Sequence, residues 1–243
     1  MLDQSFTRRN IARQIRKSDF INNAILLNED IKSKFINDAV NFSETSQFSP
    51  QDFNRKFVKG KPVYFISDFT KELALRKATE NIRNVYNKKQ SDRDVIVKQI
   101  SSLVKEGIKY KLYRLDIHSF YESIDKDSII QIIESNKDIN YRTKLLIRNL
   151  IEQFNQGGDT GLPRGMSVSA ILSEIVLSDF DSYINNHEHV FYYSRFVDDI
   201  LIITSGKEPK GFDNELKQRL PKGLKFNSTK EKNKVLILEQ AKK

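Results

Sequence analysis

The chain has 243 residues, enough to bury a sizeable core, and 41 Lys and Arg against 32 Asp and Glu give it a net charge of +9. It has no cysteine and only three scattered histidines, which excludes disulfides and thiolate chemistry and argues against a zinc site. Because the sequence has neither a membrane-length apolar run nor a secretory signal in MLDQSFTRRN, we expect a cytoplasmic protein without membrane contact.

The predicted elements of the first half are mostly helical. Spaced Ile, Leu and Phe among polar residues predict a helical segment over 8–40. A stretch marked by Pro and Ser, 46–62, predicts a soft domain boundary. A second helix is expected over 91–107. The alternating sequence YKLYRLDIHSF, residues 110–120, predicts a strand that ends near Asp116.

The second half alternates helices with short strands. The Gly-Pro-Gly loop in GLPRGMSVSA leads into an apolar-faced helix from about Ser169. Two strands, 190–196 and 200–204, are joined by a turn that holds Asp198 and Asp199. Further elements are expected as helices over 127–135, 141–154 and 211–219 and as short strands near 225 and 235. Helices packed on a small antiparallel sheet predict an α+β fold.

The charge is unevenly distributed along the chain. Residues 55–111 carry 15 basic against 6 acidic residues, and residues 205–243 carry 11 against 5. Residues 112–204 reverse the balance, with 8 basic against 14 acidic. This layout suits a protein that holds a polyanion with its flanks and cations in its middle, although a Lys-rich surface can also serve solubility alone.

Three aspartates are the candidate catalytic residues. Asp198 and Asp199 stand between two apolar strands, and Asp116 ends another strand that a sheet could place beside them. Converging carboxylates repel one another unless cations neutralise them, and Mg²⁺ is the usual partner of such oxygen ligands. Arg195, just before the turn, is expected to pair with these carboxylates. The alternative is that the Asp pair only satisfies a turn.

Four stretches resemble the reverse transcriptase family, in its order and at plausible separations. RLDIHSFYESI is similar to the first catalytic motif, GLPRGMSVSA to the substrate-positioning loop, RFVDD to the catalytic hairpin and GLKFNSTK to the following lysine motif. The resemblance implies a right-hand polymerase palm, an antiparallel sheet backed by helices, with fingers. The family's thumb would follow about where this chain stops, so a thumb is expected to be absent. It divides the chain into an N-terminal helical extension (1–54), fingers (55–111) and palm (112–243).

The resemblance also implies roles for residues around the aspartates. Asp116, Asp198 and Asp199 would be catalytic and, with the Ile117 carbonyl, would bind two Mg²⁺ ions, or Mn²⁺ in their place. Tyr121 stands where the family has the aromatic steric gate that favours deoxynucleotides. The alternative for Tyr121 is core packing beside its neighbour in sequence, and both can hold together.

Other residues are implied to bind the nucleotide. Gly165 fits a backbone that passes close to a substrate, and Arg164 stands where the family commonly has Gln, so that it could hold the triphosphate or stack on a base. Lys230 matches the lysine near the leaving pyrophosphate, or is a solvated lysine. Arg83 and Arg93 are expected to clamp the triphosphate, the alternatives being contact with a phosphate backbone or plain surface charge.

Three functions follow as hypotheses. The first is an RNA-directed DNA polymerase that uses dNTPs, an RNA template and a growing DNA product, with similarity to bacterial retroelement-type enzymes, particularly the defence-associated and abortive-infection group. The second is template-independent or protein-primed synthesis, and the third is a non-catalytic nucleic-acid-binding subunit. Because the thumb is expected to be absent, a non-coding RNA or a protein partner could supply its grip on the duplex.

Overall fold

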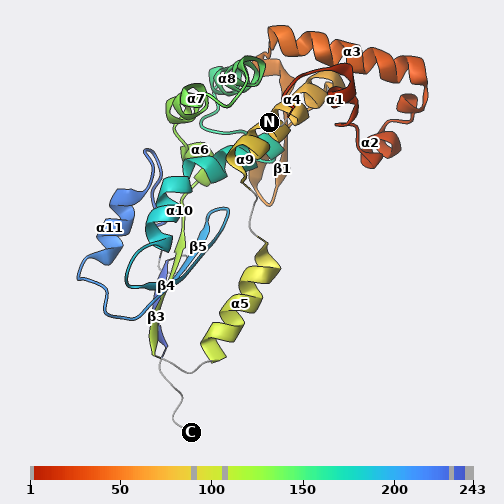
Figure 1. Cartoon of the computed structure of the whole chain (residues 1–243). Coiled ribbons are helices and arrows are strands. Elements are labelled where there is room, and N and C mark those ends of the chain that lie inside the picture. The colour runs from red at the N-terminus through yellow and green to blue at the C-terminus, as the bar shows by residue number, and fades with distance from the viewer. Residues whose placement is uncertain (1–2, 89–91, 106–108, 230–232, 239–243) are drawn as a thin grey trace. The chain divides into compact units, whose positions relative to one another are not determined.

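The computed structural model describes residues 3–88, 92–105, 109–229 and 233–238 (Figure 1). They form two compact units. Unit 1 consists of Met1–Lys88 and Asp125–Leu172, and unit 2 of Lys89–Ile124 and Ser173–Lys243. Within these described residues, no helix is long and apolar enough to span a membrane.

Unit 1 is a helical unit with a two-stranded hairpin, β1 (Phe53–Val58) and β2 (Lys61–Ile66). Helix α4 packs against α3 and α8, and its apolar residues Leu73, Ala78 and Ile82 are buried. The helices are α1 (Arg8–Ala12), α2 (Lys17–Asn22), η1 (Ala24–Leu27), α3 (Glu29–Thr45), η2 (Pro50–Asp52), α4 (Phe69–Tyr86), α7 (Lys126–Ser135) and α8 (Tyr141–Gln156). The unit boundary falls within α9 (Ser167–Val176).

The helical segment predicted over 8–40 is divided into four pieces, the short α1, α2 and η1 and the longer α3. Asn28 explains the break between η1 and α3, because it caps α3. Its Oδ1 accepts hydrogen bonds from the N–H groups of Asp30 (3.0 Å) and Ile31 (3.1 Å). A side chain that satisfies backbone donors in this way begins a new helix instead of extending the old one.

Unit 2 contains a four-stranded antiparallel sheet with the order β4-β5-β3-β6. Its strands are β3 (Tyr110–Asp116), β4 (Val190–Phe196), β5 (Asp199–Thr204) and β6 (Lys234–Leu238), and its helices are α5 (Arg93–Lys105), α6 (Phe120–Ser123), α10 (Ser178–Asn185) and α11 (Phe212–Arg219).

Helices pack on the sheet of unit 2. Leu112 and Ile203 are buried in a cluster against which Leu103 of α5 packs. Tyr113, which alternates to the opposite face, makes an edge contact with Phe212 of α11 at 5.5 Å between ring centroids. An antiparallel sheet backed by helices confirms the α+β prediction. The strand predicted near 225 is reduced to a bridge between Phe226 and Ile117.

Candidate active site

Strands β3 and β5 bring the three predicted aspartates together in unit 2. β3 ends at Asp116, β5 begins at Asp199, and these two residues are directly paired in the register. Because paired residues of an antiparallel ladder point to the same face, both carboxylates lie on one face of the sheet. Asp198 lies directly before Asp199, in the tight turn after β4. Its carbonyl accepts a hydrogen bond of 3.1 Å from the Ile117 N–H.

The donor set at this turn fits a metal that arrives with its substrate. Among the residues that the structure describes, no group of three or more His, Asp or Glu side chains is arranged to hold a metal ion. Asp116 and Asp198 are half-buried and Asp199 is exposed. Mg²⁺ commonly binds through one or two carboxylates and takes its remaining ligands from water and substrate phosphates. The paired Asp116 and Asp199, with Asp198 beside them, provide ligands of that kind.

Two asparagines that the sequence analysis missed hold Asp116. The Nδ2 of Asn227 donates to the Asp116 carboxylate (3.1 Å), and the Asn227 N–H donates to the Asp116 carbonyl (2.8 Å). The Asp116 N–H donates to Oδ1 of Asn233 (2.9 Å), and Asn233 in turn donates to the Asn227 carbonyl. In the segment GLKFNSTK the lysine matches the family motif, whereas the asparagine carries no separate signal.

Arg195 pairs with other carboxylates than the three candidate aspartates, which corrects the prediction. Its guanidinium binds Glu174 (2.6 Å) and Asp181 (2.7 Å) instead. Arg195 is paired with Ile200 in the sheet, so it points to the face opposite Asp199. Burial by itself lowers the pKa of Arg195, but the hydrogen bonds of the two carboxylates outweigh it and raise that pKa above its ordinary value.

Tyr121 lies on the short helix α6, which follows Asp116 through a residue in the left-handed region, Ser119 (φ 43°). Its side chain is 9% exposed, and its ring lies 5.3 Å from that of Phe120. The core-packing alternative therefore accounts for the burial of Tyr121, and its role as steric gate stays a prediction.

The predicted substrate-positioning loop is attached to the hairpin of unit 1. The Arg164 carbonyl accepts a hydrogen bond of 2.7 Å from the Tyr64 N–H of β2. Gly165 has φ of 99°, and a Cβ there would stand 2.3 Å from the Cγ1 of Val63. The glycine is thus required by β2, whereas close passage of a substrate stays a prediction. The Arg164 residue is half-exposed.

The predicted triphosphate clamps are both exposed. Arg83 lies in the last turn of α4 in unit 1, and Arg93 begins α5 in unit 2. Neither Arg83 nor Arg93 has an ion pair with a described residue of its own unit. Each guanidinium is therefore available to bind an anion. Lys230 lies outside the described residues. The nucleotide-binding roles of these three residues stay predictions.

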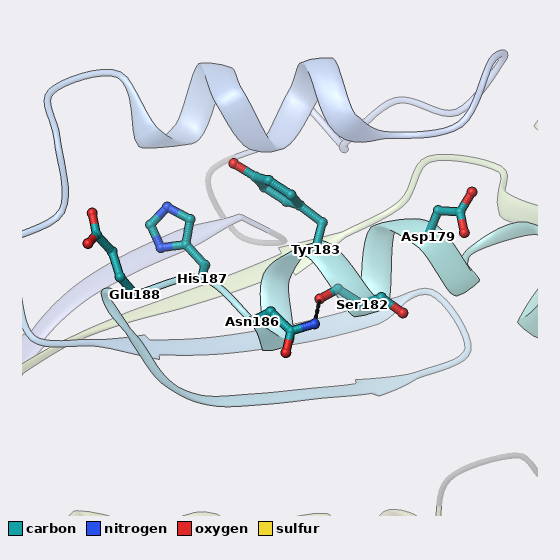
Figure 2. Close-up of a pocket in the computed structure, with 6 residues that line it drawn as sticks. All are labelled: Asp179, Ser182, Tyr183, Asn186, His187 and Glu188. Carbon is teal, nitrogen blue, oxygen red and sulfur yellow. Dashed lines mark hydrogen bonds between the residues drawn. The ribbon is translucent and has the colours of Figure 1, made fainter.

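A separate pocket of unit 2 lies along α10 (Figure 2). Its lining residues are Asp179, Ser182, Tyr183, Asn186, His187 and Glu188. The hydroxyl of Tyr183 donates to Glu215 of α11, and the Arg219 guanidinium lies 4.2 Å from the Tyr183 ring centroid. Because no predicted site residue lines this pocket and Tyr183 joins α10 to α11, we assign it a structural role.

Comparison with known proteins gives the following matches. A family model described as reverse transcriptase (RNA-dependent DNA polymerase) matches residues 71–242. Among solved structures, 55 chains match. One is apo telomerase from Candida tropicalis truncated from the C-terminal domain, with a TM-score of 0.50 and 14% identity. The match covers 79% of this chain and 51% of that one, so the chain spans about half of that structure's length, and the likeness is one of fold. No curated protein matches.

Proposed function

Because the chain belongs to the reverse transcriptase family, we propose that it is an RNA-directed DNA polymerase that adds deoxynucleotides to a primer. The observation that carries the proposal is the pairing of Asp116 with Asp199 at the end of β3 and β5, with Asp198 in the adjoining turn. Carboxylates from two strands, fixed by one register, form the rigid pair of oxygen ligands that nucleotidyl transfer needs.

In this mechanism the primer 3′-hydroxyl attacks the α-phosphorus of a dNTP, and pyrophosphate leaves. Asp116 and Asp198 would hold two Mg²⁺ ions, or Mn²⁺, together with Asp199 and the Ile117 carbonyl. Bound there, the ions would activate the attacking hydroxyl and stabilise the departing oxygen. Asn227 would keep the Asp116 carboxylate in one orientation through its hydrogen bond of 3.1 Å.

The remaining predicted residues would bind the nucleotide. Tyr121 would exclude the ribose 2′-hydroxyl, and Arg164 with Gly165 would present the positioning loop. Arg83, Arg93 and Lys230 would neutralise the triphosphate and the leaving pyrophosphate. Tyr121, Gly165 and Lys230 enter the proposal through the family motifs, whereas Arg83, Arg93 and Arg164 enter it through the affinity of a guanidinium for phosphate.

The β1–β2 hairpin supports binding of the template. No acidic residue occurs between Phe53 and Ser67, and the exposed cations of this segment are Arg55, Lys56, Lys59 and Lys61. Phe57 and Phe65 are also exposed, at 67% and 42%. Cations for phosphates and aromatic rings for bases are the two components of a single-strand binding surface.

The test is primer extension with purified chain, a DNA primer on an RNA template, dNTPs and Mg²⁺. The wild type is expected to synthesise the complement of the template, and Asp198→Asn to reduce the rate at least about a hundredfold. Asp213→Asn, the same exchange at an exposed position of α11, is the matched control and should leave the rate unchanged. Extension that is equal for wild type and Asp198→Asn would not come from this site, and it would favour the non-catalytic, nucleic-acid-binding subunit.

Template-independent or protein-primed synthesis is the second candidate. It is favoured by Arg164, whose backbone is fixed to β2 while the residue stays half-exposed, because a guanidinium can hold a triphosphate without reading a template base. Sequencing the products separates the two candidates, since a faithful complement of the template contradicts this one. An RNA or protein partner that supplies a grip on the duplex would appear in the same preparation as co-purifying material.

A role in antiviral defence is the finer part of the proposal. It is supported by the resemblance of two stretches, FYESI (residues 120–124) and RGMSVSAILSE (residues 164–174), to bacterial defence-associated reverse transcriptases. Phage should form fewer plaques on bacteria that express the wild type than on bacteria that express Asp198→Asn. Equal plaque numbers at equal expression would remove the defence role and leave the polymerase proposal intact.

A further inference from the structure

We propose that Arg195 is a positioning residue that sets the backbone of the catalytic turn from the opposite face of the sheet. The inference rests on the proposed function, because it assigns the turn that carries Asp198 and Asp199 to catalysis. Arg195 would act through the carbonyl of Val197 and make no contact with the reacting groups.

The Arg195 guanidinium uses all of its donors. It has five N–H groups, and five acceptors meet them. Nε donates to Oδ1 of Asp181 (2.9 Å) and Nη2 to its Oδ2 (2.7 Å). Nη1 and Nη2 donate to the two carboxylate oxygens of Glu174 (3.0 and 2.6 Å). The remaining Nη1 proton goes to the Val197 carbonyl (3.0 Å).

This network is buried and therefore rigid. The Arg195 side chain is 4% exposed and that of Glu174 10%. Tyr193 adds a further contact, because its hydroxyl donates to Oδ1 of Asp181 at 2.5 Å. Two forked ion pairs fix the guanidinium plane from two sides, since each fork allows only one relative orientation. The donor aimed at Val197 is thereby fixed as well.

The turn needs such an external constraint. Val197 has φ of 59°, in the left-handed region that a β-branched residue seldom adopts. Strained conformations of this kind persist where surrounding contacts over-determine them. Here the Val197 carbonyl is bound by Arg195, and the next carbonyl, of Asp198, is bound by the Ile117 N–H. The two bonds hold consecutive peptide groups of the turn.

The arrangement of the sheet argues against a direct electrostatic role for Arg195 at the candidate site. Arg195 pairs with Ile200, whereas Asp199 pairs with Asp116, so the guanidinium and the paired carboxylates lie on opposite faces. The network itself carries two carboxylates for one guanidinium, which leaves no surplus positive charge to attract a nucleotide. Arg195 is joined to the turn by its hydrogen bond to the Val197 carbonyl.

The experiment compares Arg195→Lys with the wild type in primer extension and in hydrogen–deuterium exchange. Lysine keeps the charge but has three donors and no fork, so it cannot bind two carboxylates bidentately and the carbonyl as well. We expect kcat to fall at least about tenfold, with the KM for dNTP within about twofold, because the turn is displaced while nucleotide contacts remain. Exchange of peptides that contain Ile117 and residues 197–199 should become faster.

A matched control lies at the other end of the same strands. Glu208 accepts hydrogen bonds from Lys111 (2.7 Å), Tyr113 (2.6 Å) and Thr204 (2.8 Å), and these contacts lower its pKa to about 2 against the opposing effect of burial. Glu208→Gln should destabilise unit 2 without changing kcat or exchange at the turn. If it reduces kcat as much as Arg195→Lys does, Arg195 has only a structural role.

The outcomes separate this inference from the proposed function. Arg195→Lys with wild-type kcat and wild-type exchange at the turn overturns the inference, even if extension is robust. If the wild type extends no primer, the proposed function fails, and exchange at 197–199 still tests the constraint on the turn. Should Arg195→Lys fail to fold, Glu174→Gln decides: the same loss of kcat at constant KM supports the positioning role, and unchanged kcat contradicts it.

Discussion

At the scale of single residues, the candidate site depends on neutral amides as much as on charge. Asp116 is bound through its carboxylate, its carbonyl and its N–H by two asparagines, Asn227 and Asn233. An amide N–H that donates to a carboxylate fixes the rotation of that carboxylate without neutralising it. The Asp116 oxygens thus keep their negative charge for a cation while losing orientational freedom.

Asn227→Ala should therefore reduce both primer extension and stability. We expect a loss of about tenfold in kcat, and of about 1.5–3 kcal/mol in the free energy of unfolding, for one lost hydrogen bond to a charged group. Asn227→Asp should be worse, because it puts a second carboxylate against Asp116.

Steady-state extension and chemical denaturation measure the two effects of Asn227→Ala. Asn214→Ala, on the exposed surface of α11 in the same unit, is the control and should change neither quantity. Wild-type kcat in Asn227→Ala would show that the hydrogen bond to Asp116 is dispensable.

At the scale of elements, one residue of register decides what Arg195 can reach. The sequence predicts strands over 190–196 and 200–204, and the expectation that Arg195 pairs with the aspartates rests only on its place just before the turn. In the structure β5 begins at Asp199, the turn is one residue shorter, and Arg195 pairs with Ile200 on the face opposite Asp199. Because a one-residue slip exchanges the two faces of a strand, local alternation alone could not locate the partners of Arg195.

The strands themselves could be predicted, and so could the meeting of Asp116 with the Asp pair. Both depend on alternating apolar residues and on aspartates at strand ends, which are local patterns. The contacts of Asn227 and of Glu174 could not be predicted, because they join residues 111 and 21 positions apart in the sequence. Such contacts depend on tertiary packing that no local periodicity encodes.

Gly165 gives a prediction for the attachment of the loop to the hairpin. Gly165→Ala should lower the free energy of unfolding of unit 1 by about 2–3 kcal/mol, because the new Cβ meets Val63 and the backbone is in the left-handed region. Gly60→Ala is the matched control: its φ is 75°, but nothing lies within 4 Å of the new Cβ, so only about 1 kcal/mol should be lost.

The double variant Gly165→Ala with Val63→Ala tests the cause of that loss. If the clash with the Val63 side chain is responsible, the second exchange should recover part of the stability, which denaturant titration would detect. Strictly additive losses would place the strain in the backbone alone.

At the scale of the whole molecule, the uneven charge of the sequence becomes a property of a particular element. The basic excess of residues 55–111 includes the four exposed cations of the β1–β2 hairpin, on which no acidic residue stands. On one face of the hairpin the Tyr64 ring lies 4.8 Å from that of Phe154 in α8, and Arg55 is paired with Tyr64 on that face. Lys56 and Lys61 belong to the opposite face of the ladder and Lys59 to the turn, so these three exposed lysines are available to a polyanion.

Lys59→Glu with Lys61→Glu should therefore weaken binding of single-stranded RNA and flatten its salt dependence. If each lysine neutralises one phosphate, the slope of log K against log salt concentration should become shallower by about 1.4 for the pair. Lys34→Glu with Lys137→Glu makes the same change in net charge at exposed positions of unit 1 and is the control. Fluorescence anisotropy over a range of salt concentrations measures both.

A slope that changes equally in the two double variants would mean that net charge, and not the hairpin, governs RNA binding. A smaller slope in the hairpin variant alone would place the phosphate contacts on β1–β2, because the net charge of the molecule is the same in both.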